Sequence, residues 1–192
     1  MRIAILGAGR MGAWLTEELC WNNEVMVHDS DLLKMKYFIK VHRALSIEEF
    51  ADFKPELFIN CVPLGLTIEA FDTVLPYLPS QCIISDIASV KTGFREYYEN
   101  CGHPFVSSHP MFGPTLANIR DLHEESAIII SESSKEGADF FRRFYSSLKI
   151  CIFEYSFEEH DKTVAYSLAT PFASTMVFAA CMKKQDAPGT NF

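Results

Sequence analysis

The feature that most constrains this fold is a glycine-rich loop placed directly after the first apolar run. The pattern predicts a strand at 2–6, the loop GAGRMG at 7–12 and a helix at 11–22. Glycines in this order permit a tight turn and let the backbone approach a pyrophosphate, which then lies at the amino terminus of the helix. The motif GxGxxG is common in proteins. Its position here, between a predicted strand and a predicted helix, is what makes it indicative of dinucleotide binding.

A second predicted strand leads into an acidic residue at the distance that a dinucleotide site requires. Asp29 stands 22 positions after Gly7 and follows the run 24–28. A carboxylate there accepts hydrogen bonds from the adenosine ribose and repels a 2′-phosphate. No arginine lies nearby, and Lys34 and Lys36 are a helical turn away. A glycine turn followed by a surface aspartate is the alternative, but the three features together predict dinucleotide binding, with NAD favoured over NADP.

Short apolar runs alternate with helical patterns through most of the chain. Strands are expected at 2–6, 24–28, 57–62, 82–86, 104–107, 127–131 and 150–154. Helices are expected between them at 11–22, 31–39, 46–52, 67–78, 90–100 and 134–148. Alternation with fully apolar strands indicates a mostly parallel sheet covered on both faces, and right-handed crossovers favour a doubly wound, Rossmann-type α/β fold.

The last segment shows no strand pattern. Ser156 and Glu159 have the spacing of a capping box, and apolar residues then recur at helical spacing. Pro171 is expected to kink or break this long helix. We therefore divide the chain into an NAD-binding domain, 1–155, and the apparently truncated beginning of an all-helical domain, 156–192.

Composition narrows the classes of function. With 48% hydrophobic and 22% charged residues, the chain has the composition of a globular protein. Its net charge of −8 argues against nucleic-acid binding. No apolar run approaches the roughly 18–20 residues that span a bilayer, and no signal peptide precedes the first strand, so we expect a cytoplasmic protein without membrane contact. The six cysteines are irregularly spaced, which predicts reduced thiols and no metal site.

Three more loops are expected at the carboxyl edge of the sheet, where ligands bind in this fold: 60–64, 86–91 and 107–114. The residues assigned to the cofactor are Gly7, Ala8, Gly9, Arg10, Met11, Gly12, Asp29, Val62, Pro63 and Leu64. In the third loop, the imidazole of His109 suits abstraction of a hydroxyl proton at neutral pH. Position alone leaves catalysis and a structural role open for His109, and a solvated or capping role open for His160.

At these residues the sequence resembles the prephenate dehydrogenase family, including its arogenate-using relatives. The resemblance is carried by GAGRMG at 7–12, DIASVK at 86–91, SSHPMFGP at 107–114 and EEHD at 158–161. HPMFGP is the most specific of these motifs, whereas the glycine loop is shared by many dehydrogenases. The resemblance covers essentially the whole chain, but only the earlier part of a typical family member.

The resemblance implies NAD-dependent oxidative decarboxylation of prephenate to 4-hydroxyphenylpyruvate, in tyrosine and hence aromatic amino acid biosynthesis. His109 matches the catalytic histidine, which accepts the proton of the ring hydroxyl as hydride leaves. Ser89 matches a serine that helps to hold that hydroxyl and the histidine. Loss of carbon dioxide makes the ring aromatic, so the protein mainly aligns the substrate and polarises its hydroxyl. A homodimer is implied for a full-length member.

The sequence departs from the family pattern at Ala88, where many members have glycine, and at 167–172, where many carry histidines. Contacts from the last helix are therefore open, and the substrate-binding candidates are Ser89, His109 and His160. Arogenate, which carries an amine, is an alternative substrate. A non-catalytic NAD-binding or regulatory module, which has no use for His109, is a different class of function. A beta-hydroxyacid dehydrogenase relying on a lysine is disfavoured by HPMFGP.

Overall fold

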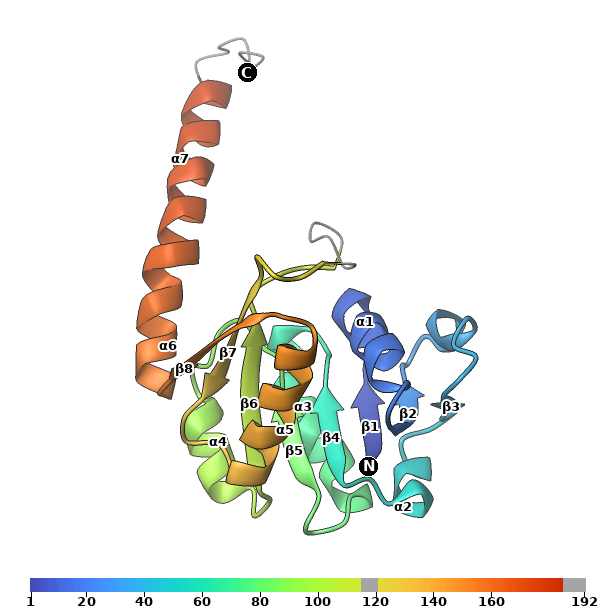
Figure 1. Cartoon of the computed structure of the whole chain (residues 1–192). Helices are drawn as coiled ribbons and strands as arrows, with labels where there is room; N and C mark the ends of the chain where they lie inside the picture. The colour runs from blue at the N-terminus through green and yellow to red at the C-terminus, as the bar shows by residue number, and fades with distance from the viewer. Residues whose placement is uncertain (115–120, 185–192) are drawn as a thin grey trace.

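The computed structural model describes residues 1–114 and 121–184, which form one sheet with helices on both faces (Figure 1). The strands are β1 (Arg2–Leu6), β2 (Glu24–His28), β3 (His42–Arg43), β4 (Leu57–Asn60), β5 (Ile83–Asp86), β6 (Phe105–Pro110), β7 (Ser126–Ile130) and β8 (Cys151–Tyr155). Their spatial order is β3-β2-β1-β4-β5-β6-β7-β8, and among neighbours only β6 and β7 are antiparallel. The predicted doubly wound, mostly parallel sheet is confirmed.

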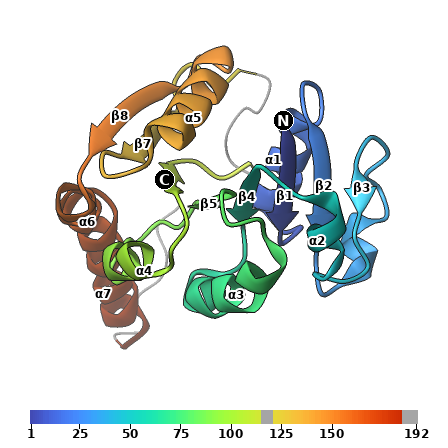
Figure 2. The same ribbon diagram turned by 90° about the horizontal axis from the view of Figure 1, so that it is seen from below.

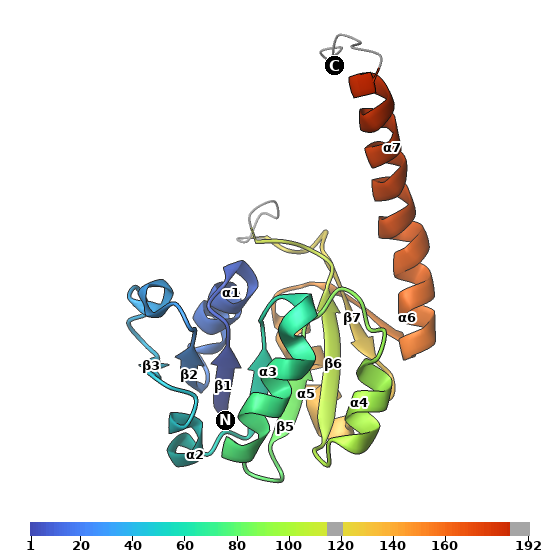
Figure 3. The same cartoon turned by 180° about the vertical axis from the view of Figure 1, so that it is seen from behind.

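Helices from both halves of the chain cover the sheet. They are α1 (Arg10–Leu19), α2 (Glu49–Phe53), α3 (Thr67–Val74), α4 (Phe94–Asn100), α5 (Lys135–Ser147), α6 (Phe157–Val164) and α7 (Thr170–Lys184). Helices α1 and α5 lie on one face and α3 and α4 on the other (Figures 2 and 3). Strand β1 shows why both faces are apolar: Ile3 and Ile5 pack under α1, while Ala4 and Leu6 pack on the opposite side. All six cysteines are free thiols.

The second crossover differs from the expected helix at 31–39. The chain forms only a short 3-10 turn at Leu32–Met35, which begins where the Asp31 carboxylate accepts the Leu33 N–H at 3.1 Å. Of the turn's residues only Met35 is buried, so no apolar face is present to stabilise a longer helix. Strand β3, which was not predicted, is a two-residue edge strand and is too short to show alternation.

The long C-terminal helix begins as predicted. Ser156 Oγ accepts the Glu159 N–H, and Glu159 Oε2 accepts the Ser156 N–H, which completes the capping box. The helix continues through Pro171 instead of breaking there. A π-helical turn at Ala165–Ala169 precedes the proline, and the Thr170 N–H reaches back to the Ala165 carbonyl. The altered register accommodates a ring that would meet the preceding turn of a regular α-helix.

This helix also corrects the expectation about membranes. Among the described residues, the segment Phe157–Lys184 is 28 residues long and has an 18-residue window of mean hydropathy 1.4, enough by length and composition to cross a bilayer. Hydroxyl residues such as Ser174 and Thr175 interrupt the apolar run, but they bond to helix carbonyls four residues back. Core helices of soluble proteins meet the same two criteria. The helix therefore does not show that the chain spans a membrane, but the expectation that no segment is long and apolar enough to do so was wrong.

We expect the aromatic layer under α3 to dominate the stability of the sheet domain. Phe71 is fully buried among Phe58, Tyr97 and Tyr98. Phe71→Ala should lower the free energy of unfolding by about 3–5 kcal/mol, because it removes apolar contacts and leaves a cavity. Phe172→Ala is the control, since Phe172 is 70% exposed and should change stability little. Chemical denaturation measures both, and equal effects would contradict this assignment of the core.

Candidate active site

The glycine loop after β1 has a backbone that only glycine can supply at two positions. Gly7 has φ +97°, and a Cβ there would lie 2.9 Å from the Cys61 carbonyl oxygen. A Cβ on Gly12 would lie 1.8 Å from the Gly7 carbonyl oxygen. Gly9, which precedes α1, differs because a Cβ there would meet nothing within 4 Å. The loop therefore packs tightly against the sheet at its ends and is open at its middle, beside the amino terminus of α1.

A cavity of about 750 Å³ opens over this loop and the end of β2. Its lining includes seven of the residues predicted to bind the cofactor: Gly7, Gly9, Arg10, Met11, Asp29, Val62 and Pro63. Ala8 and Gly12 support the loop from within, and Leu64 lines the neighbouring cavity. The size, the open backbone at Gly9 and the helix terminus fit a dinucleotide pyrophosphate and ribose.

Asp29 is held as an acceptor at the rim of this cavity. Its carboxylate oxygens accept the backbone N–H of Ala8 at 2.7 Å and of Asp31 at 2.8 Å. The Lys34 ammonium lies 3.2 Å from Oδ1. Burial alone would raise the pKa of Asp29, but the two backbone donors and Lys34 outweigh it and lower the pKa. The sequence located the carboxylate but placed Lys34 away from it, and the structure makes the two an ion pair.

A second cavity, of about 430 Å³, adjoins the first at the carboxyl ends of β4, β5 and β6. Ser89 and His109, the two predicted catalytic residues, both line it. The two cavities share three lining residues: Met11, Cys61 and Val62. The turn between them is fixed by Asn60, whose amide donates to the Thr67 carbonyl at 2.9 Å and accepts the Val62 N–H at 3.3 Å.

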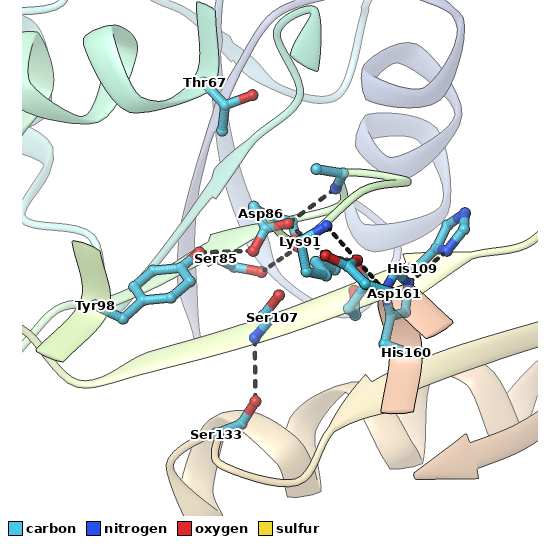
Figure 4. A network of polar contacts seen from close by, with 12 residues as sticks. Thr67, Ser85, Asp86, Lys91, Tyr98, Ser107, His109, Ser133, His160 and Asp161 are labelled. Carbon is cyan, nitrogen blue, oxygen red and sulfur yellow. Dashed lines mark hydrogen bonds and ion pairs between the residues drawn. The ribbon is translucent and has the colours of Figure 1, made fainter. Parts of the chain in front are cut away.

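Behind this cavity lies a fully buried ion pair, Lys91 with Asp86 (Figure 4). Lys91 Nζ also donates to the Ser108 carbonyl at 2.7 Å, and the Tyr98 hydroxyl donates to Asp86 at 2.7 Å. Burial lowers the pKa of Lys91, and the negative charge of Asp86 opposes that shift. Burial, followed by the charge of Lys91 and the neighbouring His160 ring, lowers the pKa of His109 to about 3. His109 is therefore a neutral imidazole at physiological pH.

His160 lies behind His109, and the protein occupies both of its ring nitrogens. Its Nε2 is 2.9 Å from His109 Nδ1, and its Nδ1 is 2.9 Å from Asp161 Oδ1. The predicted site residues did not include Asp86, Lys91 or Asp161. Asp86 and Lys91 open and close the DIASVK stretch, and Asp161 follows His160, so motif membership was the signal that could have found them.

A glycine loop at a helix terminus, a carboxylate after the next strand and a histidine-bearing cavity beside them define a dinucleotide-binding α/β domain of the dehydrogenase type. The family model described as "Prephenate dehydrogenase, nucleotide-binding domain" matches residues 28–151. The chain therefore belongs to the prephenate dehydrogenase family.

One curated relative and several solved structures resemble the chain. The relative, from Methanocaldococcus jannaschii, is described as a probable arogenate/prephenate dehydrogenase and is 26% identical over 160 residues, which are 78% of this chain and 34% of that protein. The chain thus spans about a third of that relative. Two crystal structures, of prephenate dehydrogenase from Aquifex aeolicus and of Synechocystis arogenate dehydrogenase, share 18% and 19% identity, with TM-scores of 0.84 and 0.78. They cover 95% and 97% of this chain and 71% of each solved chain, and they show the shared fold.

The open backbone at Gly9 permits a test of the cofactor cavity that spares the fold. We expect Gly9→Ala to weaken NAD binding about tenfold or more, because the methyl group enters the space that a pyrophosphate needs. The same change at Gly65, which also meets nothing within 4 Å, is the control. Isothermal calorimetry gives the affinities and thermal melting checks the fold. Unchanged affinity in a folded Gly9→Ala chain would contradict this placement of the cofactor.

Proposed function

We propose that this chain provides the cofactor and catalytic parts of an NAD-dependent dehydrogenase that oxidatively decarboxylates prephenate, with arogenate as the alternative substrate. One observation carries the proposal: the cavity that His109 lines adjoins the cavity of the glycine loop and Asp29. A substrate against His109 would therefore lie beside a dinucleotide held on α1. The choice of NAD is supported by the family's nucleotide-binding domain and by an Aquifex aeolicus relative that was solved with hydroxyphenyl propionate and NAD+.

The position of each residue in the two cavities indicates its role in the proposed reaction. When bound, the nicotinamide would supply the hydride acceptor. The loop from Gly7 to Gly12 would hold the pyrophosphate, and Asp29 would accept the ribose hydroxyls. His109 would take the proton of the ring hydroxyl on the lone pair that its neutral imidazole carries. Ser89, exposed at the same cavity, would hold that hydroxyl in place.

The proposed domain division, dimerisation and location rest on the resemblance to the family. We propose that 1–155 is the NAD-binding domain and that 156–192 begins a helical domain used for dimerisation in a cytoplasmic enzyme. Relatives named for both substrates share this fold, so the choice between prephenate and arogenate calls for parallel assays. Residues 165–184 bury no side chain, which is consistent with a helix that belongs to a second domain.

Replacing the proposed base tests the reaction directly. His109→Asn should abolish NADH formation from prephenate or arogenate while leaving NAD affinity near normal, because the imidazole lines only the second cavity. His42→Asn is the control, since His42 is an exposed residue of the edge strand β3 paired with Glu24. Turnover that survives His109→Asn would refute the catalytic assignment. Tight NAD binding by a full-length protein without turnover on either substrate would favour the non-catalytic module.

The ion pair at the rim should set the choice between NAD and NADP. We expect Asp29→Asn to weaken NAD and to strengthen NADP relative to it, because the change removes the charge that repels a 2′-phosphate. Lys34→Ala should act in the opposite direction, because it leaves Asp29 unneutralised. Lys36→Ala is the matched control. Competitive binding of the two cofactors gives the ratio, and an NADP preference in the unaltered chain would overturn the assignment of Asp29.

A further inference from the structure

Two buried histidines and a partly exposed carboxylate form a continuous polar line that ends at the wall of the second cavity, and we call them the polar triad: Asp161, His160 and His109. Asp161 Oδ1 lies 2.9 Å from His160 Nδ1, and His160 Nε2 lies 2.9 Å from His109 Nδ1. His160 is fully buried and His109 is 5% exposed. The first two residues come from α6 and the third from β6, so the line joins the C-terminal helix to the sheet (Figure 4).

The carboxylate end of the triad is fixed as an acceptor. Oδ1 of Asp161 also accepts the Lys91 backbone N–H at 2.8 Å, and Oδ2 accepts the Thr92 hydroxyl at 2.8 Å. A backbone N–H can only donate, so Asp161 must accept there. Burial tends to raise the pKa of Asp161, but these donors and His160 outweigh it and lower the pKa. Asp161 is therefore a carboxylate with no proton to give to His160.

This fixed end determines the proton positions along the line. His160 Nδ1 faces a carboxylate, so that nitrogen carries the hydrogen, and Nε2 of a neutral His160 then holds a lone pair. His109 Nδ1 faces that lone pair and must itself carry a hydrogen. The remaining nitrogen of His109, Nε2, is then the basic one. The valence of a neutral imidazole and the two distances fix these proton positions.

The charges around the triad also bear on the protonated form of His109. Lys91 disfavours a second positive charge there, while Asp86 and Asp161 favour it. Because Lys91 is already paired with Asp86, Asp161 is the carboxylate aligned with the imidazole through His160. It can stabilise an imidazolium without contacting the substrate.

We propose that His160 and Asp161 are positioning residues: they hold His109 in the tautomer whose Nε2 is basic, and they stabilise the charge that it gains with a proton. The inference rests on the proposed function and deepens it, and it gives His160 a role other than substrate contact. The proton of the substrate hydroxyl bonds to Nε2 as the O–H bond breaks. The Nδ1–H bond of His109 stays intact and donates to His160 throughout.

Histidine nitrogen NMR on the complete chain reads these proton positions without substrate or cofactor. With nitrogen-15-labelled histidine at neutral pH, His109 and His160 should both carry their hydrogen on Nδ1. His160→Leu removes the acceptor and should release His109 from that tautomer, whereas His160→Gln keeps a carbonyl acceptor and should restore it in part. Asp161→Leu should alter both rings, and Asp161→Asn, which keeps an oxygen acceptor, should alter them less.

The chain supplies its own control in an exposed pair of the same kind. Asp121 Oδ1 lies 2.9 Å from His123 Nδ1 at the surface, so Asp121→Leu should change His123 alone. A hydrogen on Nε2 of His109 in the unaltered chain, or His109 shifts that neither leucine variant changes, would overturn the triad assignment. If a full-length protein lacks turnover on both substrates while the chain shows the expected shifts, the proposed function fails and the triad stands. In a chain that turns over, His160→Leu should lower kcat about a hundredfold with little change in KM.

Discussion

The ion pair of Lys91 and Asp86 is the interaction on which the site depends most. Both side chains are fully buried, and moving such charges out of water costs several kcal/mol for each ion, so neither is tolerated without the other. The remaining polar atoms are satisfied by Tyr98 and by the Ser108 carbonyl. The pair thereby ties the end of β5 to α4 and to β6, the strand that carries His109.

The buried ion pair also fixes the loop from Asp86 to Lys91. With its side chain anchored, Lys91 presents its own backbone N–H to Asp161, and so holds α6 against the loop from β5. Ser89 lies on the same short loop, between the two charged residues of the pair, and faces the cavity. One buried pair thus sets the positions of a cavity residue, of the C-terminal helix and of the positive charge that, after burial, lowers the pKa of His109.

The sequence predicted those parts of the fold that depend on local patterns. The glycine loop, the mostly parallel sheet implied by alternation and the capping box at Ser156 all follow from residue types at short spacing. The two-residue strand β3 and the 3-10 turn at Leu32–Met35 were missed because their form depends on what they pack against. All of the predicted cofactor and catalytic residues except Ala8 and Gly12 line two adjoining cavities. Asp161 was missed because its partners lie about 70 positions away, at Lys91 and Thr92.

The C-terminal helix has two halves with different environments. Its first turns bury Phe157, His160 and Val164 against the sheet domain, whereas no residue from 165 to 184 is buried. The π-helical turn lies at this boundary, and Leu168 within it reaches the wall of the second cavity while it remains 46% exposed. The helix therefore contributes to the site from two directions, through a buried histidine behind His109 and through an open side chain at the rim. Leu168 thus joins the exposed apolar residues of the helix to the wall of the second cavity.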